Sequence, residues 1–168
     1  MTETEHRPVE VGDPTASIDF DKTPPPSRFK LRAQLLDAGS ESRVLGETDN
    51  LQLKIRVYAA HEGENAMHAH HNQDHSFIVL QGQARFYGPR GEAWDLTRNE
   101  GIWLPEGTYY CFENSGEEPL VVLRIAAMMR DKGDPEMRLG VHQQQIDAHT
   151  PENRRPEKIV YREGEFYE

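Results

Sequence analysis

The stretch that decides the fold is MHAHHNQDHSFIVL, residues 67–80. His68 and His70 lie two positions apart, so their side chains share one face of an extended chain, while His71 points to the other face. A four-residue gap then leads to His75, which starts the next predicted strand. Three neutral imidazoles that converge on one point suit a divalent transition metal. An H-x-H pair also has other interpretations, a solvated strand face or a pH-sensitive surface patch.

On both sides of this stretch, the sequence predicts a series of short strands. LQLKIRVY at 51–58 alternates apolar and polar residues with period two, which is typical of a half-buried strand. Gly, Pro and Asn turns separate the further predicted strands, which are 75–80, 84–87, 93–96, 101–104, 109–113 and 120–127. This rhythm predicts an all-β fold: a sandwich, jelly roll or barrel.

The flanking segments are less regular. A first strand is predicted over 29–36 and a last one over 158–161, while 37–50 is rich in turn residues and 141–148 favours a short helix. A chain of 168 residues suffices for one compact domain. We therefore expect a flexible N-terminal arm (1–27), a barrel (28–130, with its core motifs in 51–128) and a polar C-terminal extension (131–168).

Composition excludes several classes of protein. The formal net charge is −10, and no basic stripe that would bind nucleic acid or an anionic membrane is visible. No apolar run approaches the roughly 18 residues of a membrane span, and the polar, acidic start does not look like a secretory leader. Cys111 is the only cysteine, so no internal disulfide can form and a reducing cytoplasm is expected.

The spacing of these residues resembles that of the cupin superfamily. Its first motif has the form G-x5-H-x-H-x3–4-E-x6-G and its second the form G-x5-P-x-G-x2-H-x3-N. The positions that agree are His68, His70, Gly82, Pro105, Gly107 and Asn114. The resemblance covers roughly residues 51–128 and implies a double-stranded β-helix, or jelly-roll barrel, that binds one metal ion.

Four positions depart from the family pattern. His75 stands where the family has Glu, and Tyr110 stands where the second motif has His. The opening Gly of the first motif falls at Glu62, with Gly63 one residue later. The opening Gly of the second motif falls at Asn99, which can still adopt the left-handed turn conformation.

The resemblance and the histidine spacing together imply a metal site of His68, His70 and His75, with Tyr110 in the fourth position. Two roles are open to Tyr110. As a phenolate ligand it would favour a hard, ferric-like ion. As a hydrogen-bonding neighbour, or as a residue that fills the barrel, it would leave a three-histidine site.

A three-histidine site leaves the full charge of the metal available to an anionic, chelating substrate and to dioxygen. The leading hypothesis is a non-haem iron oxygenase or dioxygenase acting on a small organic acid or enolisable compound, with Tyr110 as proton donor or anion stabiliser. A non-redox lyase, isomerase or cyclase using manganese, nickel or zinc is the alternative. The third hypothesis is a cupin that binds a ligand without catalysis.

Strand parity predicts the residues around the metal. If the face of Arg56 is the inner one, Arg56 would hold a substrate carboxylate, and Arg124 is a similar candidate. Apolar members of this set are expected to be core rather than substrate contacts. The predicted pocket consists of Arg56, Tyr58, Phe77, Val79, Phe112 and Arg124.

The terminal segments suggest assembly, because small barrels leave sheet edges that need covering. We expect a homodimer in which residues 20–36, and the C-terminal segment near Tyr161, pack across to the partner. The alternative is a monomer with disordered tails.

Overall fold

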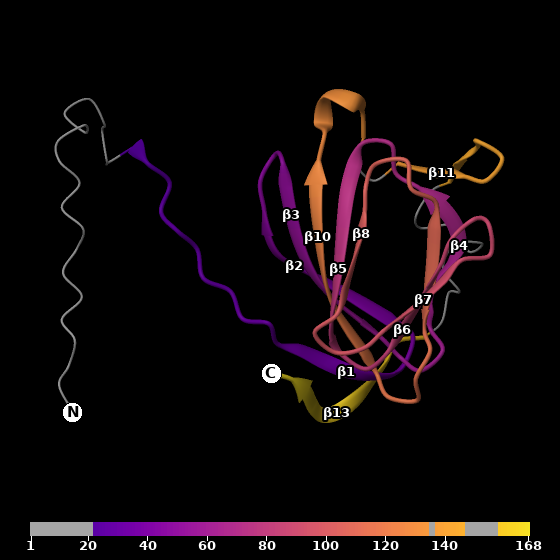
Figure 1. The fold of residues 1–168 in the computed structure, drawn as a ribbon. Coiled ribbons are helices and arrows are strands. Elements are labelled where there is room, and N and C mark those ends of the chain that lie inside the picture. The colour runs from indigo at the N-terminus through magenta and orange to yellow at the C-terminus, as the bar shows by residue number, and fades with distance from the viewer. Residues whose placement is uncertain (1–21, 135–136, 147–157) are drawn as a thin grey trace, which may run out of the picture.

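The computed structural model describes residues 22–134, 137–146 and 158–168, and the regular secondary structure in these ranges is almost entirely β-strand (Figure 1). The strands are β1 (Ala33–Ala38), β2 (Ser40–Glu47), β3 (Leu51–Tyr58), β4 (Gly63–Ala69), β5 (Gln73–Gln81), β6 (Ala84–Tyr87), β7 (Ala93–Leu96), β8 (Gly101–Leu104), β9 (Tyr110–Asn114), β10 (Leu120–Met128), β11 (Arg138–Gly140), β12 (Gln145–Ile146) and β13 (Val160–Tyr167). A short 3₁₀ turn, η2 (Arg130–Lys132), follows β10.

Two antiparallel sheets form the barrel. One has the order β2-β3-β10-β5-β8 and the other the order β12-β11-β4-β9-β6-β7. Strands that are distant in sequence pair closely, as β10 does with both β3 and β5. The expected all-β jelly roll is thus confirmed.

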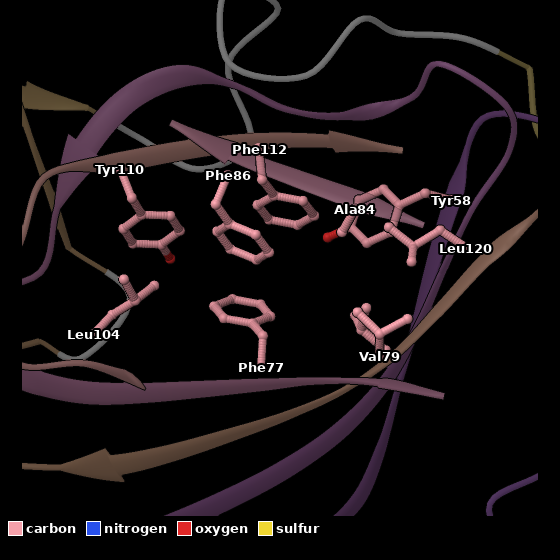
Figure 2. Packing of buried hydrophobic residues seen from close by; sticks show 10 residues of the cluster. Tyr58, Phe77, Val79, Ala84, Phe86, Leu104, Tyr110, Phe112 and Leu120 are labelled. Atoms are coloured by element: carbon pink, nitrogen blue, oxygen red, sulfur yellow. The ribbon is translucent and has the colours of Figure 1, made fainter. Parts of the chain in front are cut away.

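Aromatic side chains from both sheets fill one part of the barrel interior. Phe77 on β5 faces Phe86 on β6 and Phe112 on β9, with Tyr110 at one end of the row (Figure 2). The Phe86 and Phe112 rings stack with centroids 4.7 Å apart. All four side chains are buried, and each buried aromatic ring stabilises the fold by about 1.5–3 kcal/mol.

A second apolar layer lies outside the barrel. β1 pairs with β13 in a separate two-stranded sheet, within the same chain. Leu35 and Leu36 of β1 pack against Ile55 and Val57, whose side chains point away from the barrel interior. This layer covers the outer face of the five-stranded sheet.

The structure explains the residues found at, or next to, the two motif positions where the family has an opening glycine. A Cβ on Gly63 would lie 2.1 Å from the carbonyl oxygen of Phe112, so only glycine allows β4 to approach β9 this closely. Asn99 has a φ of 70°, which confirms the left-handed turn expected of it.

The flanking segments differ from the sequence interpretation in several places. Residues 40–47, within the segment interpreted as turn-rich, form β2, and the first strand begins at Ala33. The described part of 141–148 contains a turn and β12 instead of a helix. The segment after residue 130 adds β11 and β12 to the six-stranded sheet, and β13 to the outer layer. Across the described ranges, no helix has the length and apolar character to span a membrane.

Candidate functional site

His68 and His70 each have one ring nitrogen that lies inside the barrel without a hydrogen-bond partner. His68 Nδ1 lies 2.7 Å from the carbonyl oxygen of Ala66, and His70 Nδ1 lies 3.1 Å from that of Met137. A carbonyl oxygen only accepts, so both Nδ1 atoms carry the proton and both Nε2 atoms carry a lone pair. Both Nε2 atoms are buried without a hydrogen-bond partner. Metal-ligating histidines are typically oriented in this way.

Burial keeps these two imidazoles neutral. It lowers the pKa of His68, an effect that the nearby Glu64 carboxylate partly opposes. Burial lowers the pKa of His70 to about 2, and the neighbouring His68 and Arg138 act in the same direction. Both side chains are therefore ready to donate a lone pair at neutral pH.

His75 differs from His68 and His70 because both of its ring nitrogens lie within hydrogen-bond distance of other side chains. Its Nδ1 lies 3.0 Å from the Tyr110 hydroxyl, and its Nε2 lies 2.5 Å from Gln73 Oε1 and 2.8 Å from Nη2 of Arg124. A guanidinium only donates, so Arg124 engages the Nε2 lone pair. Burial, followed by the charge of Arg124, holds the pKa of His75 well below its usual value. Both ring nitrogens of His75 thus have partners within the protein.

Tyr110 joins the histidines to the aromatic core. It is paired with His68 across β4 and β9, and the two rings lie 4.7 Å apart. Burial raises the pKa of Tyr110 above its usual value, so its hydroxyl stays protonated. The His70 ring lies 5.2 Å from that of His68 and 4.5 Å from that of His75. The structure therefore brings all four predicted side chains together.

A buried ion pair lies beside the histidines. Arg56 Nη1 donates to Glu64 Oε1, and the Tyr58 hydroxyl lies 3.4 Å from the same oxygen. Burial opposes ionisation of Glu64, but the Arg56 and Arg138 guanidiniums hold its pKa well below the usual value. The face of Arg56 and Tyr58 is thus the inner one, and Arg56 is bound to a carboxylate of the protein itself.

Arg124 also points inward. Its Nη1 lies 2.8 Å from Gln52 Oε1, and its Nη2 lies 2.8 Å from Gln73 Oε1. Phe77, Val79 and Phe112 belong to the packed core. This is what the sequence analysis expected of the apolar members of the predicted pocket.

Three residues of the site were not predicted: Glu64, Gln73 and Arg138. Glu64 lies four positions before His68 on the same strand, so strand parity places both on the inner face. Arg138 arrives on β11, which pairs with β4, and its Nη2 lies 3.6 Å from Glu64 Oε2. No local sequence pattern signals so distant a pairing.

The donor set can be compared with the needs of a metal ion. In the part of the chain that the structure describes, no group of three or more His, Cys, Asp or Glu side chains is placed to hold a metal ion as it stands. His68 and His70 nevertheless offer two bare, buried nitrogens, and Glu64 Oε2 is a buried oxygen without a hydrogen-bond partner. Such mixed nitrogen and oxygen donors fit a divalent transition metal.

Comparison with known proteins places this geometry in a family. The cupin domain model matches residues 55–126. A mannose-1-phosphate guanylyltransferase from Klebsiella pneumoniae is 25% identical over 113 residues, which are 67% of this chain and 24% of that protein. The guanylyltransferase ManC from Salmonella typhimurium is 32% identical over 77 residues, which are 46% of this chain and 16% of that protein. The chain thus spans about a quarter, or less, of the length of these curated relatives.

Solved structures agree on the fold. A cupin superfamily protein from Desulfitobacterium hafniense superposes with a TM-score of 0.51 at 18% identity, over 61% of this chain and 99% of that one. The Cnp3 cupin domain from Schizosaccharomyces pombe gives 0.50 at 17% identity, over 55% of this chain and 67% of that one. Both sequence motifs, the matched domain and the jelly roll agree, so residues 55–126 form a domain of the cupin superfamily.

Proposed function

We propose that this chain is a metal-dependent cupin enzyme that holds one divalent transition metal through His68 and His70. The observation that carries the proposal is the pair of buried, unprotonated Nε2 atoms whose orientation is fixed by backbone carbonyls. A structural role alone would not require two such lone pairs to remain without donors. Iron is the metal we expect, with manganese, nickel or zinc as alternatives.

His75 and Tyr110 complete the predicted set. The geometry leaves the role of Tyr110 open, as a ligand or as a hydrogen-bonding neighbour of His75. Bound iron would supply Lewis acidity and redox chemistry with dioxygen. The residues of the chain would orient the substrate, exclude water and hold the proton on Tyr110.

We further propose a small organic acid or enolisable anion as the substrate. Among the described residues, the buried charged groups in the barrel are the guanidiniums of Arg56, Arg124 and Arg138 and the carboxylate of Glu64. Because the histidines are neutral, this interior is positively charged and attracts an anion. The name of the curated relatives adds one substance to test, a sugar phosphate.

A non-redox lyase, isomerase or cyclase is the second candidate. The contact between the Tyr110 hydroxyl and His75 Nδ1 favours it, because a buried phenol next to an imidazole can pass a proton to a substrate carbanion without any oxidant. For either chemistry we propose the cytoplasm as the compartment, because Cys111 is a free cysteine.

Elemental analysis of purified wild type and His70→Ala tests the metal. The proposal expects near-stoichiometric metal in wild type and a large loss in the variant, whereas negligible metal or equal content would contradict it. Dioxygen uptake with iron and a panel of small acids then separates the two candidates. Oxygen-dependent turnover supports the oxygenase, and turnover under anaerobic conditions supports the non-redox enzyme. Metal binding without any turnover would favour a ligand-binding cupin.

A further inference from the structure

Glu64 and His68 face one another across a gap that no hydrogen bond fills. Glu64 Oε2 lies 3.7 Å from His68 Nε2, and both atoms are buried without a hydrogen-bond partner. His68 donates through Nδ1 to the Ala66 carbonyl, so its Nε2 is an acceptor, and a carboxylate oxygen is also an acceptor. Two buried acceptors this close together cost free energy unless a donor or a positive group engages both of them.

The other oxygen of the same carboxylate is already engaged. Glu64 Oε1 accepts from Arg56 and lies near the Tyr58 hydroxyl. This bond fixes the carboxylate plane and leaves Oε2 directed toward the histidines. Arg138 Nη2 lies 3.6 Å from Oε2, which is too long for a hydrogen bond.

From these contacts we propose that Glu64 is the carboxylate ligand of the metal, so that His68, His70 and Glu64 form the protein's ligand set. This inference rests on the proposed metal-dependent function and assigns the metal a different set of protein ligands. Two ligands about 2.1 Å from one metal lie about 3.0–3.6 Å apart at ligand–metal–ligand angles of 90–120°. The observed 3.7 Å is slightly longer, so binding draws the two side chains together.

Two histidines and one carboxylate form the ligand set typical of non-haem Fe(II) oxygenases. In this arrangement the Nε2 lone pair of His75 stays with Nη2 of Arg124, 2.8 Å away. One anionic ligand also reduces the charge of the bound ion, which a site of three neutral histidines would not do. The positive charges of Arg124 and Arg138 remain available to an anionic substrate.

Isothermal titration of metal-free protein with Mn²⁺ or Co²⁺ tests the assignment. Glu64→Gln keeps the shape of the side chain, and its amide can accept from Arg56 while donating to His68 Nε2, so the variant should fold. We expect its metal affinity to fall at least tenfold and the visible Co²⁺ spectrum to change. The matched control is Glu92→Gln, which makes the same change in the ion pair with Arg90 on the turn before β7 and should retain wild-type affinity.

The outcomes separate this inference from the proposed function. If wild type binds metal, His70→Ala loses it and Glu64→Gln binds as wild type does, the assignment of Glu64 is wrong while the metal enzyme stands. If Glu92→Gln weakens binding as much as Glu64→Gln, the loss is not specific to Glu64 and the assignment also fails. If wild type binds no metal, the proposed function itself is refuted.

Discussion

Arg124 Nη2 donates to the Nε2 atom of His75 across 2.8 Å, deep inside the barrel. A lone pair that accepts this hydrogen bond cannot bind a metal ion at the same time. The position of Arg124 therefore decides whether His75 can act as a metal ligand. It also places a positive charge beside the candidate metal site.

Replacing Arg124 by Gln should strengthen metal binding. The change removes a buried positive charge and frees His75 Nε2, while the new amide can still donate to one of the neighbouring Gln side chains. We expect an increase of about tenfold or more in Mn²⁺ affinity, or about 1.4 kcal/mol, measured by isothermal titration. Arg85→Gln, which alters an exposed pair with Asp95, serves as the control and should leave the affinity unchanged. Weaker binding in the Arg124 variant would contradict this interpretation.

The metal-free protein should lose stability as the pH falls from 7 to 5. The pKa values of His68, His70 and His75 are all lowered in the fold, so within this window the unfolded chain binds more protons than the native one. The free energy of unfolding should then decrease with falling pH, by about 2 kcal/mol for His70 alone at pH 5. Urea denaturation at several pH values, with a chelator present, measures the slope.

His70→Gln provides the control for this pH dependence. Between pH 6 and 5 its slope should be smaller than that of wild type by up to about 1.4 kcal/mol per pH unit, because one titrating group is gone. The pKa of Glu64 is lowered as well, but its contribution is lost only below its unfolded value near 4.5, outside this window. A stability that stays flat or rises toward pH 5 would show that the histidines are not buried in the neutral form.

Asn114 should be essential to stability. Its fully buried amide nitrogen lies 3.3, 3.0 and 2.8 Å from the carbonyl oxygens of Tyr58, Ala59 and Glu118. Asn114→Ala leaves these groups without a donor and should cost about 2–3 kcal/mol in urea denaturation. Asn114→Asp, which places a carboxylate against the same oxygens, should cost more. Asn50→Ala, at an exposed position, should cost little; equal losses in all three variants would be inconsistent with this network.

We expect the protein to be a homodimer. Residues 22–29 extend away from the barrel without a strand partner, and Phe29 on this segment is exposed (Figure 1). Light scattering after gel filtration should give twice the chain mass of 19.3 kDa, and Phe29→Ser should shift the molecule toward the monomer. A monomeric wild type at tens of micromolar would refute the expectation.

Sequence patterns predicted the strands in which apolar and polar side chains alternate. Residues 51–58 alternate because Ile55 and Val57 face the outer apolar layer while Arg56 and Tyr58 face the barrel interior. β2 was missed because it lies at the edge of its sheet and is largely exposed, so no alternation marks it. Its strand conformation comes from pairing with β3, which a local pattern does not contain.

The histidine cluster was predictable because strand parity and the family motifs depend on residues that are close together in the sequence. The partners of these histidines could not be predicted in this way. Arg138 reaches Glu64 only because β11 pairs with β4, and Arg124 reaches His75 only because β10 pairs with β5. The spacing of the histidines predicts where they gather, but the hydrogen bonds that distinguish His75 from His68 and His70 depend on these distant pairings.

The pairing of β1 with β13 has a consequence for how the protein is made. β1 leaves the ribosome early, yet its strand partner is complete only when Tyr167 has been added. Until then the outer face around Ile55 and Val57 lacks its finished cover, although the barrel strands through β10 have already been synthesised. The nascent chain thus carries an exposed apolar patch that chaperones and proteases can reach until β13 pairs with β1.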